Sequence, residues 1–371
     1  MSIAFIDLQA QRQALEPGLT KALQKVLDRG DFIQGQEVRE FELALAQFCG
    51  ADHVISCANG TDALTLVGMA EGLGVGDAVF VPAFTFVATA EAFSILGATP
   101  YFVDVDPRTF NMDTESLKAG IVDAKAKGLT PKMVVGVDLF GQPADYQSLA
   151  VVSKAENLIL VADAAQGLGA TLHSKSVVEY VDYTTTSFFP AKPLGCYGDG
   201  GAVLCKDAEK ASLLKSLAQH GKGQQKYDNV RIGLNSRLDT LQAAVLLQKL
   251  NVFPGELKTR QDVSQRYFEA LKSKVETPFV LDGAVSSWAQ YTLKLDNRNA
   301  FQSTLKEKGI PTAVYYPMPL NQQTGYKNDP VVPGGVPVSD GLARQVISLP
   351  MHAYMPDKVQ DFIIEEVLKA L

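Results

Sequence analysis

The sequence contains little of what builds cross-linked or metal-bound proteins. It has 4 cysteines and 4 histidines among 371 residues. No two cysteines stand in a Cys-x-x-Cys spacing, and the histidines are far apart along the chain. We therefore expect neither a disulfide framework nor a zinc site, and we predict no bound metal.

Long hydrophobic runs and an excess of basic charge are also missing. The longest apolar stretches, such as residues 158–162, are far shorter than the roughly 18 to 20 residues that span a bilayer. The amino terminus lacks the basic region and apolar core of a signal peptide, so we expect a cytoplasmic protein that does not enter the membrane. The 34 lysines and arginines are scattered and outnumbered by 41 acidic residues, which argues against nucleic-acid binding.

The apolar content of 46% is enough for a large core and two domains in a chain of this length. Helix-period segments alternate with short apolar runs in the first two thirds, which is typical of a mostly parallel sheet covered by helices. The predicted fold class is therefore α/β. Strands are expected at residues 78–81, 100–103, 133–137, 158–162, 184–188 and 202–205.

The pattern changes after a strongly helical stretch that begins at Arg237. Pro254 and Gly255 interrupt it, so we predict a large domain over residues 1–253 and a small C-terminal α/β domain over residues 254–371. In the small domain we expect a helix from about residue 256, a strand at 289–295, a helix near 301–308, a strand at 312–316 and helices near 339–346 and 356–371.

Lys192 and Asp163 are the first candidates for chemistry. Lys192 stands among small, aromatic and proline residues, about thirty residues after an apolar strand that ends in Asp163. Such surroundings partly desolvate the amine, lower its pKa and free the neutral form that makes a Schiff base with an aldehyde. A carboxylate at the end of a buried strand can pair with the pyridinium nitrogen of pyridoxal phosphate. Asp163 could instead cap a following helix.

Residues 59–62 form a candidate phosphate-binding turn. They lie between an apolar stretch at 54–57 and a helix at 63–70. Free N–H groups at Gly60 and Thr61, together with the Thr61 hydroxyl, would point at an anion there. Taken alone, the same pattern would be a plain helix cap.

Three further side chains can contribute to a cofactor site. Gln166 can donate to the phenolic oxygen of the cofactor, and Ser187 can add a hydroxyl to the phosphate. Phe86 follows a strand and can stack on a flat cofactor ring. A place in the core is the alternative for Phe86.

Eight segments spread over nearly the whole chain carry a resemblance to one family. They are Phe5-Ile-Asp-Leu, Asn59-Gly-Thr-Asp-Ala-Leu, Pro82-Ala-Phe-Thr-Phe-Val-Ala-Thr-Ala, Val103-Asp-Val-Asp-Pro, Gly141-Gln-Pro-Ala-Asp, Asp163-Ala-Ala-Gln, Ser187-Phe-Phe-Pro-Ala-Lys and Asn235-Ser-Arg-Leu-Asp. With these segments the chain resembles the DegT/DnrJ/StrS nucleotide-sugar aminotransferases. The resemblance implies the aspartate-aminotransferase fold (fold type I), the cofactor pyridoxal 5′-phosphate and a homodimer whose active sites lie at the subunit interface.

By motif match, the resemblance also implies the roles of the catalytic residues. Lys192 would be the Schiff-base lysine and proton shuttle, Asp163 the partner of the pyridinium nitrogen and Gln166 the partner of the phenolic oxygen. Some relatives have histidine in place of the lysine and perform deoxygenation, so Lys192 favours transamination.

The same match implies the remaining cofactor contacts. Phe86 would stack on the ring, and Gly60, Thr61 and Ser187 would hold the phosphate. Asn235 would reach that phosphate from the second subunit.

Within the family, the chain looks closest to the UDP-2-acetamido-2-deoxy-3-oxo-glucuronate aminotransferases. These enzymes move the amino group of L-glutamate to C3 of the sugar through pyridoxamine phosphate, on the way to the diamino-uronic acids of surface polysaccharides such as the O-antigen of lipopolysaccharide. Arg237 suits a carboxylate of either substrate, because a guanidinium binds carboxylates with two hydrogen bonds. Tyr315 and Tyr316 are further candidates for substrate contact, and Tyr315 stands where the closest relatives have histidine.

Several other functions stay open at this point. A different keto-sugar, aminated at C3 or C4 and linked to TDP or UDP, is the first alternative. A sugar dehydratase and a cofactor-binding regulator without turnover are the others. The loops at residues 221–229 and 315–323 are expected to select the sugar.

Overall fold

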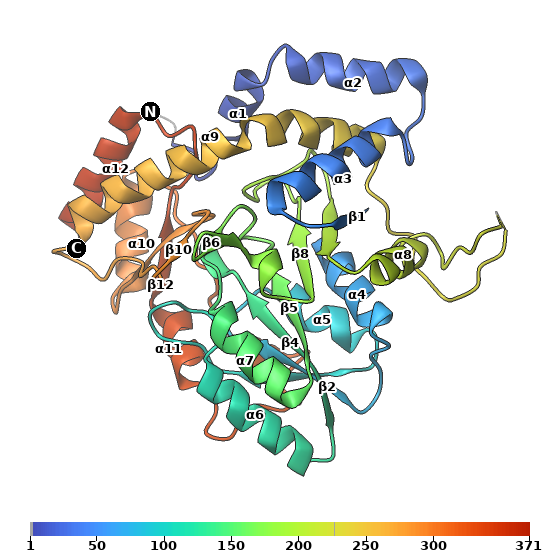
Figure 1. Ribbon diagram of the computed structural model, residues 1–371. Coiled ribbons are helices and arrows are strands. Elements are labelled where there is room, and N and C mark those ends of the chain that lie inside the picture. The colour runs from blue at the N-terminus through green and yellow to red at the C-terminus, as the bar shows by residue number, and fades with distance from the viewer. Residues whose placement is uncertain (1–2, 226) are drawn as a thin grey trace.

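The computed structural model of the chain describes residues 3–225 and 227–371, and its largest part is a twisted sheet with helices on both faces (Figure 1). The strands of this sheet, in chain order, are β1 (His53–Cys57), β2 (Asp77–Pro82), β3 (Thr99–Val103), β4 (Thr130–Val137), β5 (Ile159–Asp163), β8 (Tyr183–Ser187) and β9 (Gly201–Cys205).

The strands of this seven-stranded sheet lie in the order β1-β9-β8-β5-β4-β2-β3. β8, β5, β4, β2 and β3 run parallel, whereas β9 lies antiparallel between β1 and β8. The predicted α/β class with a mostly parallel sheet is confirmed. Each of the six predicted strands falls on an observed strand, with slightly displaced ends.

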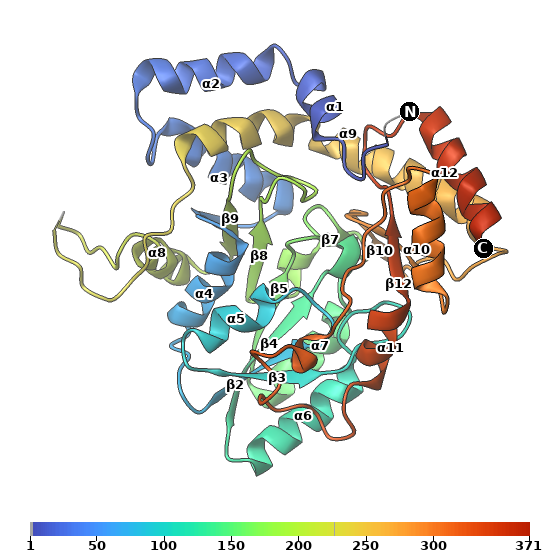
Figure 2. The ribbon, with the colours of Figure 1, turned by 180° about the vertical axis from the view of Figure 1, so that it is seen from behind.

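Helices fill the connections of the sheet and cover its faces (Figure 2). They are α1 (Leu8–Ala14), α2 (Gly18–Arg29), α3 (Gln36–Cys49), α4 (Gly60–Ala70), α5 (Ala88–Ser94), α6 (Thr114–Ala126), α7 (Tyr146–Glu156) and α8 (Ala208–Leu217).

The core lies on both faces of the sheet, as the alternation along β2 shows. Val79 and Val81 pack with α4, α5 and α8, whereas Ala78 and Phe80 pack with α6 and α7. All four side chains are fully buried. Burying a valine or phenylalanine stabilises the fold by roughly 1.5–3 kcal/mol, so these layers hold the strand ends in fixed positions.

The C-terminal part packs around the far half of a long helix, α9 (Thr240–Leu271). It contains β10 (Ala284–Val285), β11 (Tyr291–Lys294), α10 (Arg298–Glu307), α11 (Pro337–Gln345), β12 (Val346–Leu349) and α12 (Asp357–Ala370). β11 and β12 pair antiparallel, and β10 joins the short strands β6 (Thr171–Leu172) and β7 (Lys175–Ser176). None of the helices in residues 3–225 and 227–371 is long and apolar enough to cross a membrane.

The predicted interruption at Pro254 and Gly255 is wrong, because α9 continues through both residues. An internal proline removes one hydrogen bond and costs about 3 kcal/mol. The helix buries apolar side chains on both sides of this point, among them Phe253 and Val263, and this packing outweighs the loss. No helix end therefore marks a boundary between residues 253 and 254, and the division of the chain there stays a prediction.

The predicted strand at residues 312–316 is also wrong. Only Ala313 forms a bridge, with Ser348 of β12. The segment lies between Pro311 and Pro317, which have no N–H to donate to a ladder. β12 itself was not predicted, because its first residue was assigned to the helix before it.

Candidate functional site

The candidate site lies at one edge of the sheet, where the carboxyl ends of its parallel strands meet. β5 ends there in Asp163 and β8 in Ser187, and α4 begins there at Gly60, just after β1. Open α/β sheets bind their ligands at this edge. Three residues that are far apart in the sequence are thereby brought to one place.

Asp163 is a buried carboxylate with few partners. Its side chain is 7% exposed. Its Oδ2 accepts a hydrogen bond from the Thr89 hydroxyl at 2.9 Å, and its Oδ1 accepts one from the Ala165 N–H at 3.2 Å. Burial raises the pKa of Asp163, while these two donors and the charge of Lys192 lower it. Thr89 was not among the predicted site residues; its place one helical turn after Thr85 in the motif that contains Phe86 was the only signal.

Lys192 follows β8 in a compact turn, in which its N–H donates to the carbonyl of Phe189 at 2.9 Å. Its side chain is partly buried. Burial lowers the pKa of Lys192, and the Asp163 carboxylate opposes this shift. The two residues thus act on each other electrostatically within one site, and the neutral amine is favoured relative to a lysine in water.

Gln166 presents the donor end of its amide to the site. Its Oε1 accepts a hydrogen bond from the Phe140 N–H at 2.6 Å. Because a backbone N–H can only donate, this contact fixes which end of the amide is the oxygen. The Nε2 group then donates to the Tyr316 hydroxyl at 3.3 Å. The sequence did not point to Phe140, which acts through its backbone.

The start of α4 forms a narrow turn beside Ser187. Asn59 caps the helix, its Oδ1 accepting from the Asp62 N–H at 2.8 Å, so the plain capping role holds for Asn59. The N–H groups of Gly60 and Thr61 precede the first helical hydrogen bond. A Cβ atom on Gly60 would lie 2.7 Å from the Cβ of Ser187, so only glycine fits this approach.

We expect Gly60→Ala to distort this turn. The added methyl overlaps Ser187, and relieving the overlap should weaken binding of a phosphate-bearing ligand by about tenfold, the factor that corresponds to about 1.4 kcal/mol of strain. The measurement is a titration of the protein with pyridoxal phosphate. Gly74→Ala is the matched control, because no atom lies within 4 Å of the added methyl; equal affinity of the two variants would contradict the prediction.

Aromatic rings line the side of the site that faces Gln166. Tyr316 lies with its ring centroid 6.1 Å from Phe86 and 5.7 Å from Tyr315. Tyr315 in turn meets Phe5 of the N-terminal segment at 6.4 Å. Phe86 is 51% exposed, so the alternative that it belongs to the core is wrong.

Asn235 and Arg237 lie in the segment between α8 and α9. Asn235 is exposed and pairs through its backbone with Gln219, and Arg237 is partly exposed. Ser236 between them is buried and accepts a hydrogen bond from the Ala58 N–H at 3.1 Å, next to the turn at Gly60. Figures 1 and 2 show the segment after α8 projecting away from the body of the molecule.

The residues that the structure brings together fit pyridoxal 5′-phosphate. The site offers a lysine with a lowered pKa, a buried carboxylate that needs a cationic partner, an oriented amide donor and a turn of free N–H groups beside a serine hydroxyl. These are the groups that the aldehyde, the pyridinium nitrogen, the phenolic oxygen and the phosphate of this cofactor require.

Comparisons with known proteins agree with this fit. The family model described as the DegT/DnrJ/EryC1/StrS aminotransferase family matches residues 14–368. The chain is 45% identical to the UDP-2-acetamido-2-deoxy-3-oxo-D-glucuronate aminotransferase of Pseudomonas aeruginosa, over 95% of this chain and 96% of that protein.

Solved structures extend the similarity to the fold. A DegT DnrJ EryC1 StrS aminotransferase from Brucella abortus superposes with a TM-score of 0.97 and 48% identity, over 99% of both chains. NtdA from Bacillus subtilis, whose crystal structure contains the bound cofactor PMP, has a TM-score of 0.89 and 27% identity, over 100% of this chain and 85% of that one.

Proposed function

The chain belongs to the DegT/DnrJ/EryC1/StrS aminotransferase family, and on that premise we propose that it transfers the amino group of L-glutamate to C3 of UDP-2-acetamido-2-deoxy-3-oxo-glucuronate. The protein is a sugar aminotransferase, and its cofactor is pyridoxal 5′-phosphate. The similarity to the Pseudomonas aeruginosa enzyme supports the choice of sugar. The observation that carries the chemistry is that Lys192 and the buried Asp163 shift each other's pKa, with the oriented Gln166 amide three residues after Asp163.

The cofactor, when bound, supplies a protonated ring that withdraws the electrons left behind when a carbon loses its proton. Asp163 would hold that ring nitrogen in its protonated form, because a buried carboxylate is stabilised by an adjacent cation. Gln166 would donate to the phenolic oxygen. Phe86 would cover the ring.

Lys192 would move the proton. Burial shifts its amine toward the neutral form, which can take the α-proton of the donor amino acid as a general base. The resulting ammonium can then give the proton to the C4′ carbon of the cofactor, as a general acid. The Asp163 carboxylate acts against the effect of burial and keeps the pKa of Lys192 from falling further.

The remaining predicted residues would bind charged groups of the substrates and the cofactor. Gly60, Thr61 and Ser187 would hold the phosphate at the start of α4, where free N–H groups favour an anion. Arg237 would bind a carboxylate of glutamate or of the uronate.

We also propose a homodimer in which Asn235 reaches the phosphate of the partner's site. Large apolar side chains are exposed in segments that carry or adjoin predicted site residues: Ile33 is 50% exposed, Phe189 52% and Ile232 88%. Phe189 lies three residues before Lys192, and Ile33 forms a bridge with Asp239, close to Asn235. Exposed apolar groups in one region favour a protein–protein contact, and a contact here would join Asn235 to a second site.

Mixing two inactive variants tests the shared site. We expect Lys192→Ala and Asn235→Asp each to lose activity as separate homodimers, the second because its carboxylate repels the phosphate. After subunit exchange, mixed dimers have one site with both defects and one intact site, so activity should return to about a quarter of the wild-type value at equal mixing. No recovery after demonstrated exchange would contradict a site built from both subunits.

The proposed reaction is tested by the visible absorption of the protein loaded with pyridoxal phosphate. Glutamate should remove the visible band, and the 3-oxo-uronate sugar should restore it with formation of the amino sugar. A band that responds to glutamate and is restored only by another keto-sugar would refute the uronate. A place in lipopolysaccharide synthesis and a cytoplasmic location stay predictions.

A further inference from the structure

We infer that Asp138 is a positioning residue that holds the turn whose backbone orients the Gln166 amide. The inference rests on the proposed role of Gln166 as the donor to the phenolic oxygen of the cofactor. It concerns a residue outside the site: Asp138 directly follows β4 and is fully buried.

Asp138 forms hydrogen bonds with its neighbours through both its backbone and its side chain. Its own N–H donates to the carbonyl of Asp163 at 3.0 Å. Its side-chain Oδ1 accepts from the Ala144 N–H at 3.1 Å and from the Tyr146 hydroxyl at 2.6 Å. One residue therefore ties the end of β5 to the start of α7, and its side chain bridges the two ends of the loop that connects β4 to α7.

The loop between these anchors adopts a backbone conformation that needs support. It contains the short turn Leu139–Gly141, and Phe140 in it has φ of 60°. Residues other than glycine rarely adopt this left-handed backbone conformation, which costs roughly 1–2 kcal/mol. That conformation directs the Phe140 N–H to the Oε1 of Gln166, at 2.6 Å. Release of the anchors would let the turn relax and withdraw this donor.

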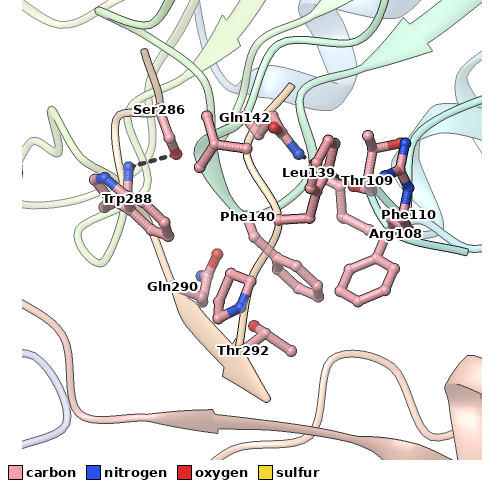
Figure 3. Close-up of a pocket in the computed structure, with 13 residues that line it drawn as sticks. Arg108, Thr109, Phe110, Leu139, Phe140, Gln142, Ser286, Trp288, Gln290 and Thr292 are labelled. Carbon is pink, nitrogen blue, oxygen red and sulfur yellow. Dashed lines mark hydrogen bonds between the residues drawn. The ribbon is translucent and has the colours of Figure 1, made fainter. Parts of the chain in front are cut away.

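Asp138 also contacts the segment that carries Gln166. A Cβ atom on Gly167 would lie 2.3 Å from the Cβ of Asp138, so the two backbones are in close contact. Leu139 and Phe140 also line a small pocket of about 20 Å³ (Figure 3). There Phe140 meets Phe110, with ring centroids 5.9 Å apart.

The chemistry of Asp138 suits a positioning role without charge. Its Oδ2 has no hydrogen-bond partner among the described residues. Burial raises the pKa of Asp138 to about 7, and the titratable groups that face it are Tyr146 and Asp163. A neutral carboxyl would spare Asp163 a repulsion, and asparagine reproduces its shape and its Oδ1 acceptor.

The test uses the pH at which the visible band of the cofactor-loaded protein changes. A donor to the phenolic oxygen favours the deprotonated chromophore, so losing the donor raises this apparent pKa. Gln166→Ala defines the full effect. We expect Asp138→Ala to raise the apparent pKa by about half a unit to one unit, the shift that one hydrogen bond produces. Asp138→Asn should stay close to wild type, and Tyr146→Phe, which removes one anchor, should shift it less in the same direction.

Two controls separate positioning from general destabilisation. Asp145→Ala removes the cap of α7, where Asp145 accepts from the Ser148 N–H at 3.1 Å, and it should lower the melting temperature without moving the band. Combined with Gln166→Ala, Asp138→Ala should add no further shift.

An apparent pKa in Asp138→Ala equal to that of the wild type overturns the inference. If Asp138→Ala does not fold, the same result in Tyr146→Phe overturns it. In both cases the visible band of the wild type leaves the proposed function intact. If Asp138→Ala raises the apparent pKa as much in the Gln166→Ala background as in the wild type, the inference is also overturned. A wild-type protein that shows no visible band with added cofactor overturns both the inference and the proposed function.

Discussion

Replacing Lys192 by alanine is expected to lower transamination by roughly a thousandfold or more, because the general base and acid of the reaction is removed. The cofactor should still bind through Asp163, Gln166 and the turn at Gly60, without a covalent link. Turnover with glutamate and the keto-sugar measures the first effect. Retention of cofactor after gel filtration, compared before and after borohydride reduction and denaturation, measures the second.

Lys206→Ala is the matched control for this variant. Lys206 is an exposed lysine that pairs with Glu179 on the surface, and its replacement removes the same side chain away from the site. Its turnover should equal that of the wild type. Substantial turnover in Lys192→Ala, beyond what added small amines can restore, would refute the assignment of the lysine.

Asp163→Asn is expected to weaken cofactor binding by at least about tenfold and to slow turnover by roughly a hundredfold. Asparagine keeps the oxygen that accepts from the Ala165 N–H, but it loses the charge and replaces the oxygen that accepts from the Thr89 hydroxyl with an amide donor. The ring nitrogen would then lose the anion that keeps it protonated, and the lysine would lose the group that raises its pKa. Cofactor titration and single-turnover rates with glutamate measure the two effects.

The control for Asp163 lies at the opposite edge of the same sheet. Asp182, just before β8, accepts a hydrogen bond from the Leu160 N–H at 2.9 Å. Asp182→Asn removes a charge without touching the site, and we expect normal cofactor affinity. Normal kinetics in Asp163→Asn would show that the carboxylate has no part in the reaction.

The sequence predicted those parts of the site that depend on where strands end. The apolar run that closes in Asp163 and the strand predicted at residues 184–188, which contains Ser187, bring these residues to one sheet edge, because parallel strands share a direction. The glycine at position 60 marked a turn before a helix, and the structure shows why no larger residue fits there. These features can be predicted because each depends only on residues that are close together in the sequence.

The parts that could not be predicted depend on contacts between distant segments. Phe140 orients Gln166 through a backbone N–H, and a backbone group leaves no trace in the residue type. Thr89 contacts Asp163 across 74 positions of sequence. Pro254 predicts an interruption of the helix, but α9 continues through it because packing along the helix outweighs one missing hydrogen bond.

The spread of the site along the chain has a consequence for synthesis. The turn at Gly60 leaves the ribosome well before Tyr316, which meets the Gln166 amide. A nascent chain that lacks residue 316 therefore has no complete site, and the cofactor is expected to bind fully only after both segments have been synthesised and have folded together. Since a ligand that binds the native state stabilises it by mass action, cofactor supply is expected to set the lifetime of the completed enzyme in the cell rather than the course of its folding.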